Sequence, residues 1–277
     1  MKKEKVKKSK KEKAPLKPEY TETGGLDYSV YYMKTPEKLL YFVLAAAVLF
    51  ALGYIFYRRV PVAAVFSLLA LRYPKMRTKT IIANRRKKLM LQFKDMLYSL
   101  SSAIGAGSSV ERAMSEVLAD MERQYADPNT YIIKELELIV SKLNLNQNIE
   151  DLFADLAERS QLEDIRTFAN IFSISKRTGG NIIQIIRQTS DIITQKIETR
   201  NEIETLLAEK KMEQKIMVAM PIGLTFLLTE TTGDFMSVLF AIPEGKLFGT
   251  GQVVCTIALA IILVGYLWGK KLTDITI

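Results

Sequence analysis

Residues 39–57 read LLYFVLAAAVLFALGYIFY, and this stretch decides how the rest of the chain is interpreted. It holds 19 residues without a charged side chain. At a rise of about 1.5 Å per residue, a helix of this length would be about 28 Å long, which matches the hydrocarbon core of a bilayer. The sequence therefore predicts a membrane-spanning helix here.

Basic residues lie on both sides of this stretch. Residues 1–18 carry nine Lys without apolar periodicity, which predicts a disordered basic tail. A second apolar run, residues 60–71, precedes a basic segment that has no acid before Asp95. Because Lys and Arg favour the cytoplasmic side, both flanks are expected inside, so residues 39–74 would form a transmembrane hairpin. The second run is short, and a re-entrant or interfacial segment is its alternative.

Two further apolar runs occur near the C-terminus, at residues 216–229 and 251–269. The loop between them is rich in acids, whereas Lys residues lie before the first run and after the second. This charge distribution predicts an external loop and a multi-pass protein of the inner or plasma membrane, with four spans and both termini cytoplasmic. The single Cys, Cys255, lies inside the fourth predicted span and is expected to be a packing residue.

The middle of the chain has the opposite charge. Residues 89–215 contain 15 basic and 20 acidic side chains, although the whole chain carries a net charge of +9. The positive charge therefore belongs to the tail and the juxtamembrane segment, where anionic lipid headgroups would meet it. Nucleic acid is not expected as a partner.

Apolar residues in this middle part recur with helical periodicity in six segments, and Gly, Pro and Asn turns separate them. Strand signals are absent, so the fold class is all-α, with a cytoplasmic antiparallel six-helix bundle. The sixth helix meets no breaker between Asn181 and Pro221, and it is expected to run about 60 Å into the third span. The predicted core includes Phe93, Leu97, Met114, Val117, Leu136, Ile139, Phe153, Leu156, Phe168, Phe172, Ile186 and Ile193.

These patterns divide the chain into eight segments. They are a basic disordered cytoplasmic tail (1–38), a transmembrane hairpin (39–74), a basic juxtamembrane linker (75–88), the cytoplasmic helical domain (89–215), a third span (216–231), an external loop (232–250), a fourth span (251–269) and a cytoplasmic tail (270–277).

The composition excludes most recognisable enzyme chemistry. The chain has no His and one Cys, which rules out imidazole bases, His metal sites, Ser-His or Cys-His nucleophile pairs, disulfides, Cys-cluster zinc and iron–sulfur centres. No catalytic residue, cofactor or metal site is expected, and the protein is not expected to be an enzyme.

Two glycine-containing turns are candidate functional sites. Gly107 and Ser108 lie in Gly-Ala-Gly-Ser-Ser, which precedes a predicted helix and could hold a phosphate at its N-terminus. The segment lacks the Lys and the preceding strand of known phosphate loops. The end of one helix followed by the N-terminal cap of the next is therefore expected, with Ser108 and Glu111 in capping-box spacing. The second turn is also expected to end one helix at its glycines and to cap the next helix with Asn181. It consists of Arg177, Thr178, Gly179, Gly180 and Asn181.

Acidic residues are the other candidates. Between Glu111 and Asp164 there are 13 acids and five bases, which could coordinate a divalent cation, form a solvated face or dock a partner. No spacing matches a calcium loop. Glu230 and Asp234 could be functional intramembrane acids or interfacial residues that pair with Arg58 or Arg59. The hypothetical docking residues are Glu111, Glu116, Asp120, Glu135, Glu137, Asp151 and Asp155.

The order of these features resembles a known family. Two spans, a six-helix domain with Gly107-Ser108-Ser109-Val110 opening its second helix, Arg177 to Asn181 before its last helix, and two more spans resemble the type II secretion system F-domain family. Within it, the layout is most similar to tight-adherence (Tad, or Flp) pilus assembly platform proteins of the TadB type. The resemblance covers residues 39–272, with 89–215 as the F domain.

The resemblance implies an inner-membrane assembly platform that couples a cytoplasmic secretion ATPase to the assembly of pilin subunits, with no catalytic residues of its own. A paralogous platform protein or a second copy would be a further partner. A small transporter or channel subunit is the alternative, but the predicted spans offer few polar residues for a substrate path.

Overall fold

The computed structural model describes residues 19–57, 60–231 and 250–273, and every regular element within these ranges is a helix. The predicted tail of residues 1–18, Arg58, Arg59, Asp234 with most of the predicted external loop, and residues 274–277 lie outside the described ranges. The helices are α1 (Thr35–Tyr57), α2 (Val60–Leu68), the 3-10 helix η1 (Leu69–Arg72), α3 (Tyr73–Gly105), α4 (Val110–Gln124), α5 (Tyr131–Asn144), α6 (Ile149–Ser160), α7 (Glu163–Thr178), α8 (Ile182–Thr231) and α10 (Thr250–Thr273).

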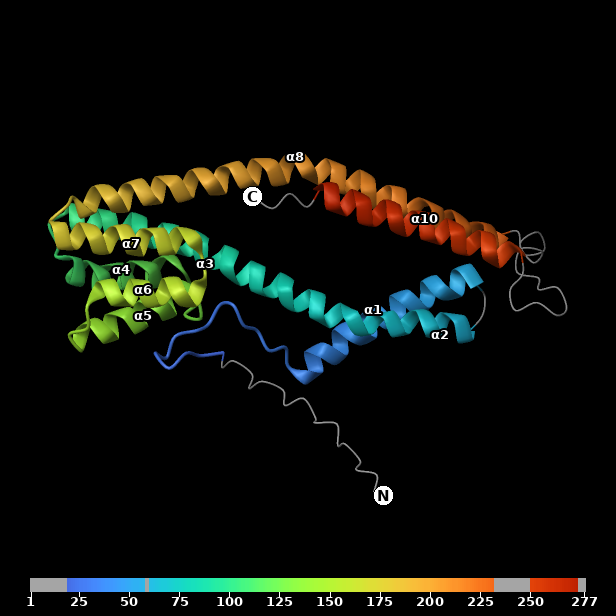
Figure 1. Cartoon of the computed structure of the whole chain (residues 1–277), viewed down its shortest axis with the longest axis horizontal. Coiled ribbons are helices and arrows are strands. Elements are labelled where there is room, and N and C mark those ends of the chain that lie inside the picture. Colours follow the sequence, from blue (N-terminus) through green and yellow to red (C-terminus); the bar gives the residue numbers. More distant parts are fainter. Residues whose placement is uncertain (1–18, 58–59, 232–249, 274–277) are drawn as a thin grey trace, which may run out of the picture.

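One hydrophobic core joins the second half of α3, the helices α4 to α7 and the first part of α8. These helices gather at one end of the molecule (Figure 1). Phe153 and Phe168 pack edge to face with ring centroids 5.1 Å apart, and Phe172 lies 5.1 Å from Phe153. The twelve residues named above are buried, whereas other residues of the same predicted apolar faces are only partly buried and pack against the core: Ile104, Val110, Leu118, Val140, Leu143, Leu162, Ile182 and Ile197. The helical periodicity of this domain is therefore confirmed.

The other end of the molecule consists of two helical hairpins (Figure 1). In the first, α1 returns through α2, η1 and the start of α3, and Gly53 allows close approach because a Cβ there would lie 2.9 Å from the Cα of Ala63. In the second, α10 returns along α8, and Gln214 donates a hydrogen bond to the carbonyl of Tyr266 at 2.9 Å. The Tyr57 and Thr256 hydroxyls, 2.7 Å apart, connect the two hairpins.

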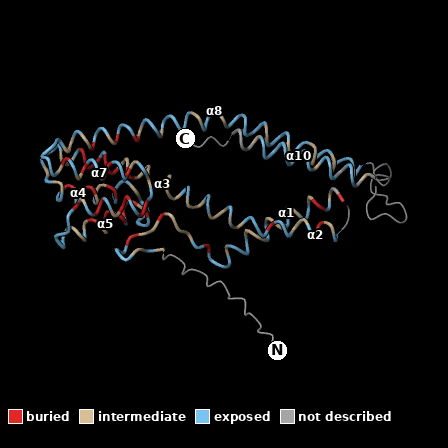
Figure 2. The backbone as a smooth tube through the Cα atoms, viewed as in Figure 1, coloured by how far each residue is buried: buried red, intermediate tan, exposed pale blue. Residues whose placement is uncertain are grey.

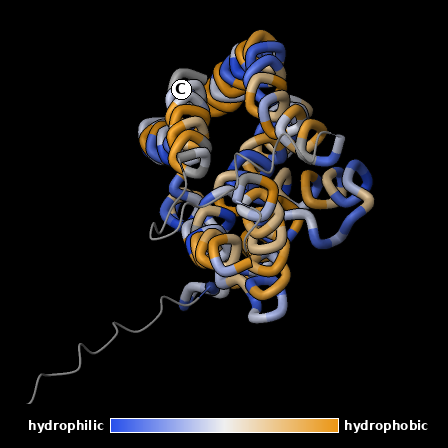
Figure 3. The backbone as a smooth tube through the Cα atoms, turned by 90° about the vertical axis from the view of Figure 1, so that its right-hand side faces the viewer, coloured by the Kyte–Doolittle hydropathy of each residue, from blue (hydrophilic) through white to orange (hydrophobic). Residues whose placement is uncertain are grey.

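The hairpins leave apolar side chains exposed. Buried residues concentrate in the bundle, whereas the hairpins are mostly exposed (Figure 2), and apolar residues make up much of the helices seen from their end (Figure 3). Leu40 on α1 is 61% exposed and Ile261 on α10 is 67% exposed. By length and composition, one stretch in the described residues, Thr35–Ile55, could cross a membrane, and Thr256–Gly269 is a shorter apolar helix. Exposed apolar surface of this kind marks a membrane or partner contact.

The helix α3 is longer than its predicted segment, whereas α8 extends as far as predicted. Residues 75–88, predicted as a linker, belong to α3, because Lys and Arg are good helix formers and no glycine interrupts the chain before Gly105. The helix α8 extends from the bundle through Pro221 to Thr231. The prediction that the last helix of the bundle runs into the third apolar segment is confirmed.

The prediction that residues 1–38 form a disordered tail is wrong for residues 19–38. Residues 19–34 form an irregular segment, here called the strap, which packs on the bundle, and residues 35–38 already belong to α1. Tyr28 is 1% exposed and is part of the bundle core. The prediction failed because an irregular segment has no periodicity from which to read its burial.

Candidate functional site

The seven acids predicted to dock a partner occupy three helices of the bundle. Glu111, Glu116 and Asp120 lie on α4, Glu135 and Glu137 on α5, and Asp151 and Asp155 on α6. They do not form one acidic face, because their exposure and their partners differ.

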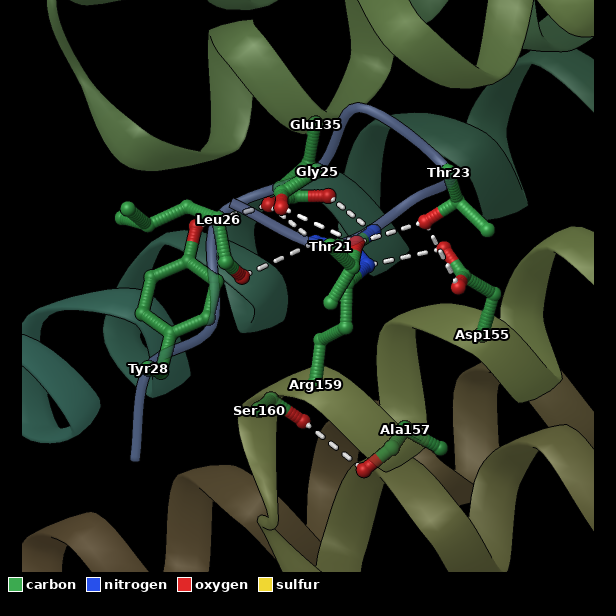
Figure 4. Close-up of polar contacts among 10 residues, drawn as sticks. All are labelled: Thr21, Thr23, Gly25, Leu26, Tyr28, Glu135, Asp155, Ala157, Arg159 and Ser160. Atoms are coloured by element: carbon green, nitrogen blue, oxygen red, sulfur yellow. Dashed lines mark hydrogen bonds and ion pairs between the residues drawn. The ribbon is translucent and has the colours of Figure 1, made fainter. Parts of the chain in front are cut away.

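Glu135 is buried, with 2% of its surface exposed, so it cannot contact a partner directly. Two nitrogens of Arg159 donate to its carboxylate at 2.7 and 2.6 Å, and the Tyr28 hydroxyl donates to it at 2.9 Å (Figure 4). This is a correction to the docking prediction. Its physical reason is position: Glu135 follows Ile132 by three residues and precedes Ile139 by four, so it lies on the apolar face of α5.

Asp155 is also engaged. It accepts a hydrogen bond from Nε of Arg159 at 2.8 Å and another from the hydroxyl of Thr23 at 3.0 Å. Asp155 therefore helps to hold Arg159 and the strap, and its charge is already neutralised at the surface of the bundle.

Arg159 is the centre of this cluster and fastens the strap to α5 and α6. Besides its two carboxylate partners, the Arg159 guanidinium donates a hydrogen bond to the backbone carbonyl of Leu26 at 3.2 Å. The backbone amide of Tyr28 donates a hydrogen bond to the backbone carbonyl of Arg159 at 3.0 Å. Gly25 packs against the guanidinium so closely that a Cβ there would lie 2.3 Å from Cζ. Any larger residue at position 25 would displace the guanidinium or the strap.

The electrostatics keep Tyr28 neutral and Arg159 charged near neutral pH. Burial and the neighbouring charge of Glu135 raise the pKa of Tyr28 far above its ordinary value. Burial lowers the pKa of Arg159, but the hydrogen bonds and charges of Glu135 and Asp155 outweigh it and leave the pKa raised. Tyr28 and Arg159 are therefore suited to a permanent structural connection and unsuited to proton transfer near neutral pH.

The acids of α4 are partly paired. Glu116 accepts from Ser108 at 3.1 Å and from Arg112 at 3.2 Å, and Asp120 accepts from Ser99 at 2.8 Å and pairs with Arg123. The hydrogen bond from Ser99 lowers the pKa of Asp120 despite partial burial. These carboxylates connect α4 to its own turn and to α3.

Three predicted docking acids remain exposed: Glu111, Glu137 and Asp151. Glu111 lies 3.4 Å from Lys176, which also pairs with Glu150 at 3.2 Å. Glu137 and Asp151 form no ion pair with any residue in the described ranges. These two side chains, on the neighbouring helices α5 and α6, are the most available of the set.

The turn before α4 reverses the chain in a left-handed conformation. Gly107 has a φ of +96°, and the cap of α4 is Ser109, whose side chain accepts from the amide of Arg112 at 3.4 Å. The capping prediction for Ser108 is therefore wrong by one residue. The reason is that Ser108 turns its hydroxyl toward Glu116.

The turn before α8 matches its predicted capping role. Gly179 ends α7 with a φ of +72°, and the side chain of Asn181 accepts from the amide of Gln184 at 3.1 Å, which caps α8. Thr178 bonds back to the carbonyl of Ile174, and Arg177 is exposed. Gly180 lies against Ser175, where a Cβ would come within 2.5 Å of the hydroxyl.

Glu230 lies in the last turn of α8 and is exposed, whereas its predicted partners, Arg58 and Arg59, and the second boundary acid, Asp234, lie outside the described ranges. No group of three or more metal-ligating side chains occurs in the part of the chain that the structure describes.

The described residues define a class: an all-helical bundle that long helices connect to apolar hairpins, one of which contains a candidate membrane span. Residues 96–229 match the model of a family described as type II secretion system (T2SS), protein F. The match begins in α3, covers α4 to α7 and ends near the end of α8, and it supports the resemblance to the F-domain family. Comparisons with curated proteins and with solved structures gave no significant match.

Proposed function

We propose that this protein is an inner-membrane assembly platform of a type II secretion or type IV pilus machine of the Tad/Flp kind. In this proposal it couples a cytoplasmic secretion ATPase to pilin subunits. The observation that carries the proposal is the family match over residues 96–229, because it covers the bundle and the helix that leaves it. A paralogous platform protein or a second copy of the chain completes the assembly.

The proposed topology has four spans. The helix α1 is the first, the arm of α2, η1 and the start of α3 is the second, and the C-terminal part of α8 and α10 are the third and fourth. Exposed apolar side chains on both hairpins support this arrangement, since the free energy of apolar surface favours lipid over water. The bundle and both termini then lie in the cytoplasm.

The proposed docking surface for the ATPase centres on Glu137 and Asp151. Both are exposed and lie on adjacent helices, and neither forms an ion pair within the described residues. Glu111 extends this surface at the start of α4. Unpaired surface carboxylates add specificity and association rate when a basic partner surface meets them.

The experiment is co-purification of the secretion ATPase with the full-length chain from detergent-solubilised membranes. The double variant Glu137→Lys and Asp151→Lys is expected to reduce ATPase recovery about tenfold, because it replaces attraction by repulsion at both positions. The matched control reverses two exposed acids of α8, Glu198→Lys and Glu202→Lys, and should leave recovery unchanged.

Equal ATPase recovery from the docking and control variants would overturn the docking surface. Failure of the wild-type chain to retain any ATPase would contradict the platform function itself.

A further inference from the structure

A groove opens where the end of the strap meets the starts of α1 and α3. Its volume is about 560 Å³, within the range of small-molecule sites. It lies at the N-terminal end of Thr35–Ile55, the candidate membrane span. The groove is lined by Tyr31, Tyr32, Met33, Thr35, Lys38, Leu39, Phe42, Leu71, Pro74 and Thr78.

The lining changes character along the direction of α1. Tyr31, Thr35 and Lys38 line the end near the strap, whereas Leu39 and Phe42 line the end that continues into the apolar part of the helix. Such a gradient matches an amphiphile, with a polar group at the first end and a hydrocarbon chain at the second. Tyr and Lys side chains at the end of a membrane span also mark the interfacial region of a bilayer.

The charge around the groove is positive. Lys38 lines it, and Arg77, the neighbour of the lining residue Thr78, stacks over the ring of Tyr41 with its Cζ 5.3 Å from the ring centroid. The buried Nε of Arg77 has no hydrogen-bond partner among the described residues. The acid at this end of α1, Glu37, already accepts a hydrogen bond from Tyr31 at 2.9 Å.

We propose that this groove binds an anionic phospholipid of the cytoplasmic leaflet, with the headgroup phosphate near Lys38 and Arg77 and an acyl chain along Leu39 and Phe42. The site rests on the proposed membrane function, because only a membrane-embedded α1 presents the groove to lipid. Charge complementarity selects a phospholipid with net negative charge over a zwitterionic one. The strap supplies Tyr31 and Tyr32 to the same groove, so bound lipid would connect the bundle-attached strap to the bilayer.

The experiment measures lipid retention by the full-length chain in detergent micelles, using native mass spectrometry. Phosphatidylglycerol and phosphatidylcholine are the two probes, and inorganic phosphate is the competitor. The wild-type chain should retain about tenfold more phosphatidylglycerol than phosphatidylcholine, because each cation near a membrane surface favours anionic lipid. Millimolar inorganic phosphate should not displace the lipid, because it has no acyl chain.

Two variants test the site by different means. Lys38→Gln with Arg77→Gln should remove the preference for phosphatidylglycerol, and Thr78→Trp should reduce retention of both lipids by filling the groove without changing charge. The control, Lys134→Gln with Arg123→Gln, removes one Lys and one Arg from the bundle and should retain lipid as the wild type does. Thermal unfolding of each variant establishes that it is folded.

Each other outcome overturns the proposal. Equal retention of the two lipids, unchanged preference in the Lys38 and Arg77 variant, or displacement by inorganic phosphate would show that the groove is not a site for an anionic phospholipid, while the platform function would stand. A chain that partitions into the soluble fraction of cells would overturn both.

Discussion

At the scale of single residues, Arg159 makes the buried polar contacts that connect the strap to the bundle. It is 3% exposed and holds Glu135, Asp155 and a strap carbonyl at once. Replacing Arg159 by Met leaves the buried charge of Glu135 unpaired, so we expect a loss of about 3 to 5 kcal/mol in the free energy of unfolding. Urea unfolding of the purified chain in detergent, followed by circular dichroism, measures this loss.

Two controls separate the buried ion pair from general effects of removing an arginine. Arg112→Met, in a pair whose arginine is 79% exposed, should cost less than about 1 kcal/mol. The double variant Glu135→Met with Arg159→Met should recover much of the loss, because apolar residues can replace a buried ion pair. A single variant that loses no more than the Arg112 control would contradict the assigned role of Arg159.

Tyr28 predicts an alkaline dependence of stability. Its pKa is raised in the folded chain, so above about pH 10 only the unfolded chain releases this proton. The contribution of Tyr28 is therefore complete below about pH 10 and decreases by about 1.4 kcal/mol per pH unit above it. The difference in unfolding free energy between the wild type and Tyr28→Phe, measured by urea unfolding at pH 8, 10 and 11, should be constant at first and then shrink. A constant difference through pH 11 would refute the buried hydrogen bond.

The acidic composition of the bundle does not show which of its acids are exposed, and for this reason the docking prediction is wrong at Glu135. The heptad position of Glu135, between Ile132 and Ile139, was a readable signal of burial. The hydrogen-bond partners of Glu135 could not be predicted from the sequence, because Tyr28 and Arg159 lie 107 and 24 residues away along the chain. Long-range polar contacts of this kind leave no local pattern.

At the scale of elements, α8 is the physical connection between the bundle and the second hairpin. Its 50 residues give a length of about 75 Å, and its first part packs against α3, where Lys87 pairs with Glu204 at 2.9 Å. We propose that this helix transmits displacement of the bundle into the hairpin. The transmission requires a stiff helix beyond Glu204.

Glycine substitution tests this stiffness without changing the number of residues in α8 or the helical register of the residues that follow. Ala208, Glu209, Lys211 and Met212 are exposed, so replacing all four by Gly removes little packing but costs about 1 kcal/mol of helix stability at each position. Pilin assembly, measured as surface filaments by electron microscopy, should be lost while the chain remains in the membrane. The matched control replaces Glu209, Lys211 and Met212 by Ala, and filaments should persist; filaments in both variants would exclude mechanical transmission through α8.

The helices of the bundle could be predicted from sequence because each buries one face, and burial imposes a period of 3.6 residues. The start of α3 and the strap could not. Residues 75–88 are helical although they add no residue to the buried core, and the strap buries Tyr28 and Met33 without being helical. Apolar periodicity in the sequence therefore predicts an element only where that element is both regular and buried on one face.

At the scale of the whole molecule, the proposed topology places the bundle and the predicted loop of residues 232–250 on opposite sides of the membrane. Cysteine labelling tests this in a Cys255→Ser background. With a membrane-impermeant maleimide, Lys134→Cys should react only after the cells are broken, whereas Glu244→Cys should react in intact spheroplasts. Reaction of both residues, or of neither, in intact spheroplasts would contradict the four-span arrangement.

Charge distribution explains why topology could be proposed from sequence and why the partners could not. The basic segments lie beside apolar runs and leave the bundle acidic, which is a pattern of the whole chain. The proposed docking surface depends instead on which acids remain unpaired after folding. Only the structure separates Glu137 and Asp151 from the internally paired Glu135 and Asp155.

The most direct test of the platform function is pilin export in cells that lack this chain. Surface pilin, measured by immunoblot of sheared filaments, should be absent from the deletion strain although pilin is still made. The wild-type chain should restore it, and the variant Glu137→Lys with Asp151→Lys should restore less than about a tenth. Normal surface pilin in the deletion strain would contradict the account.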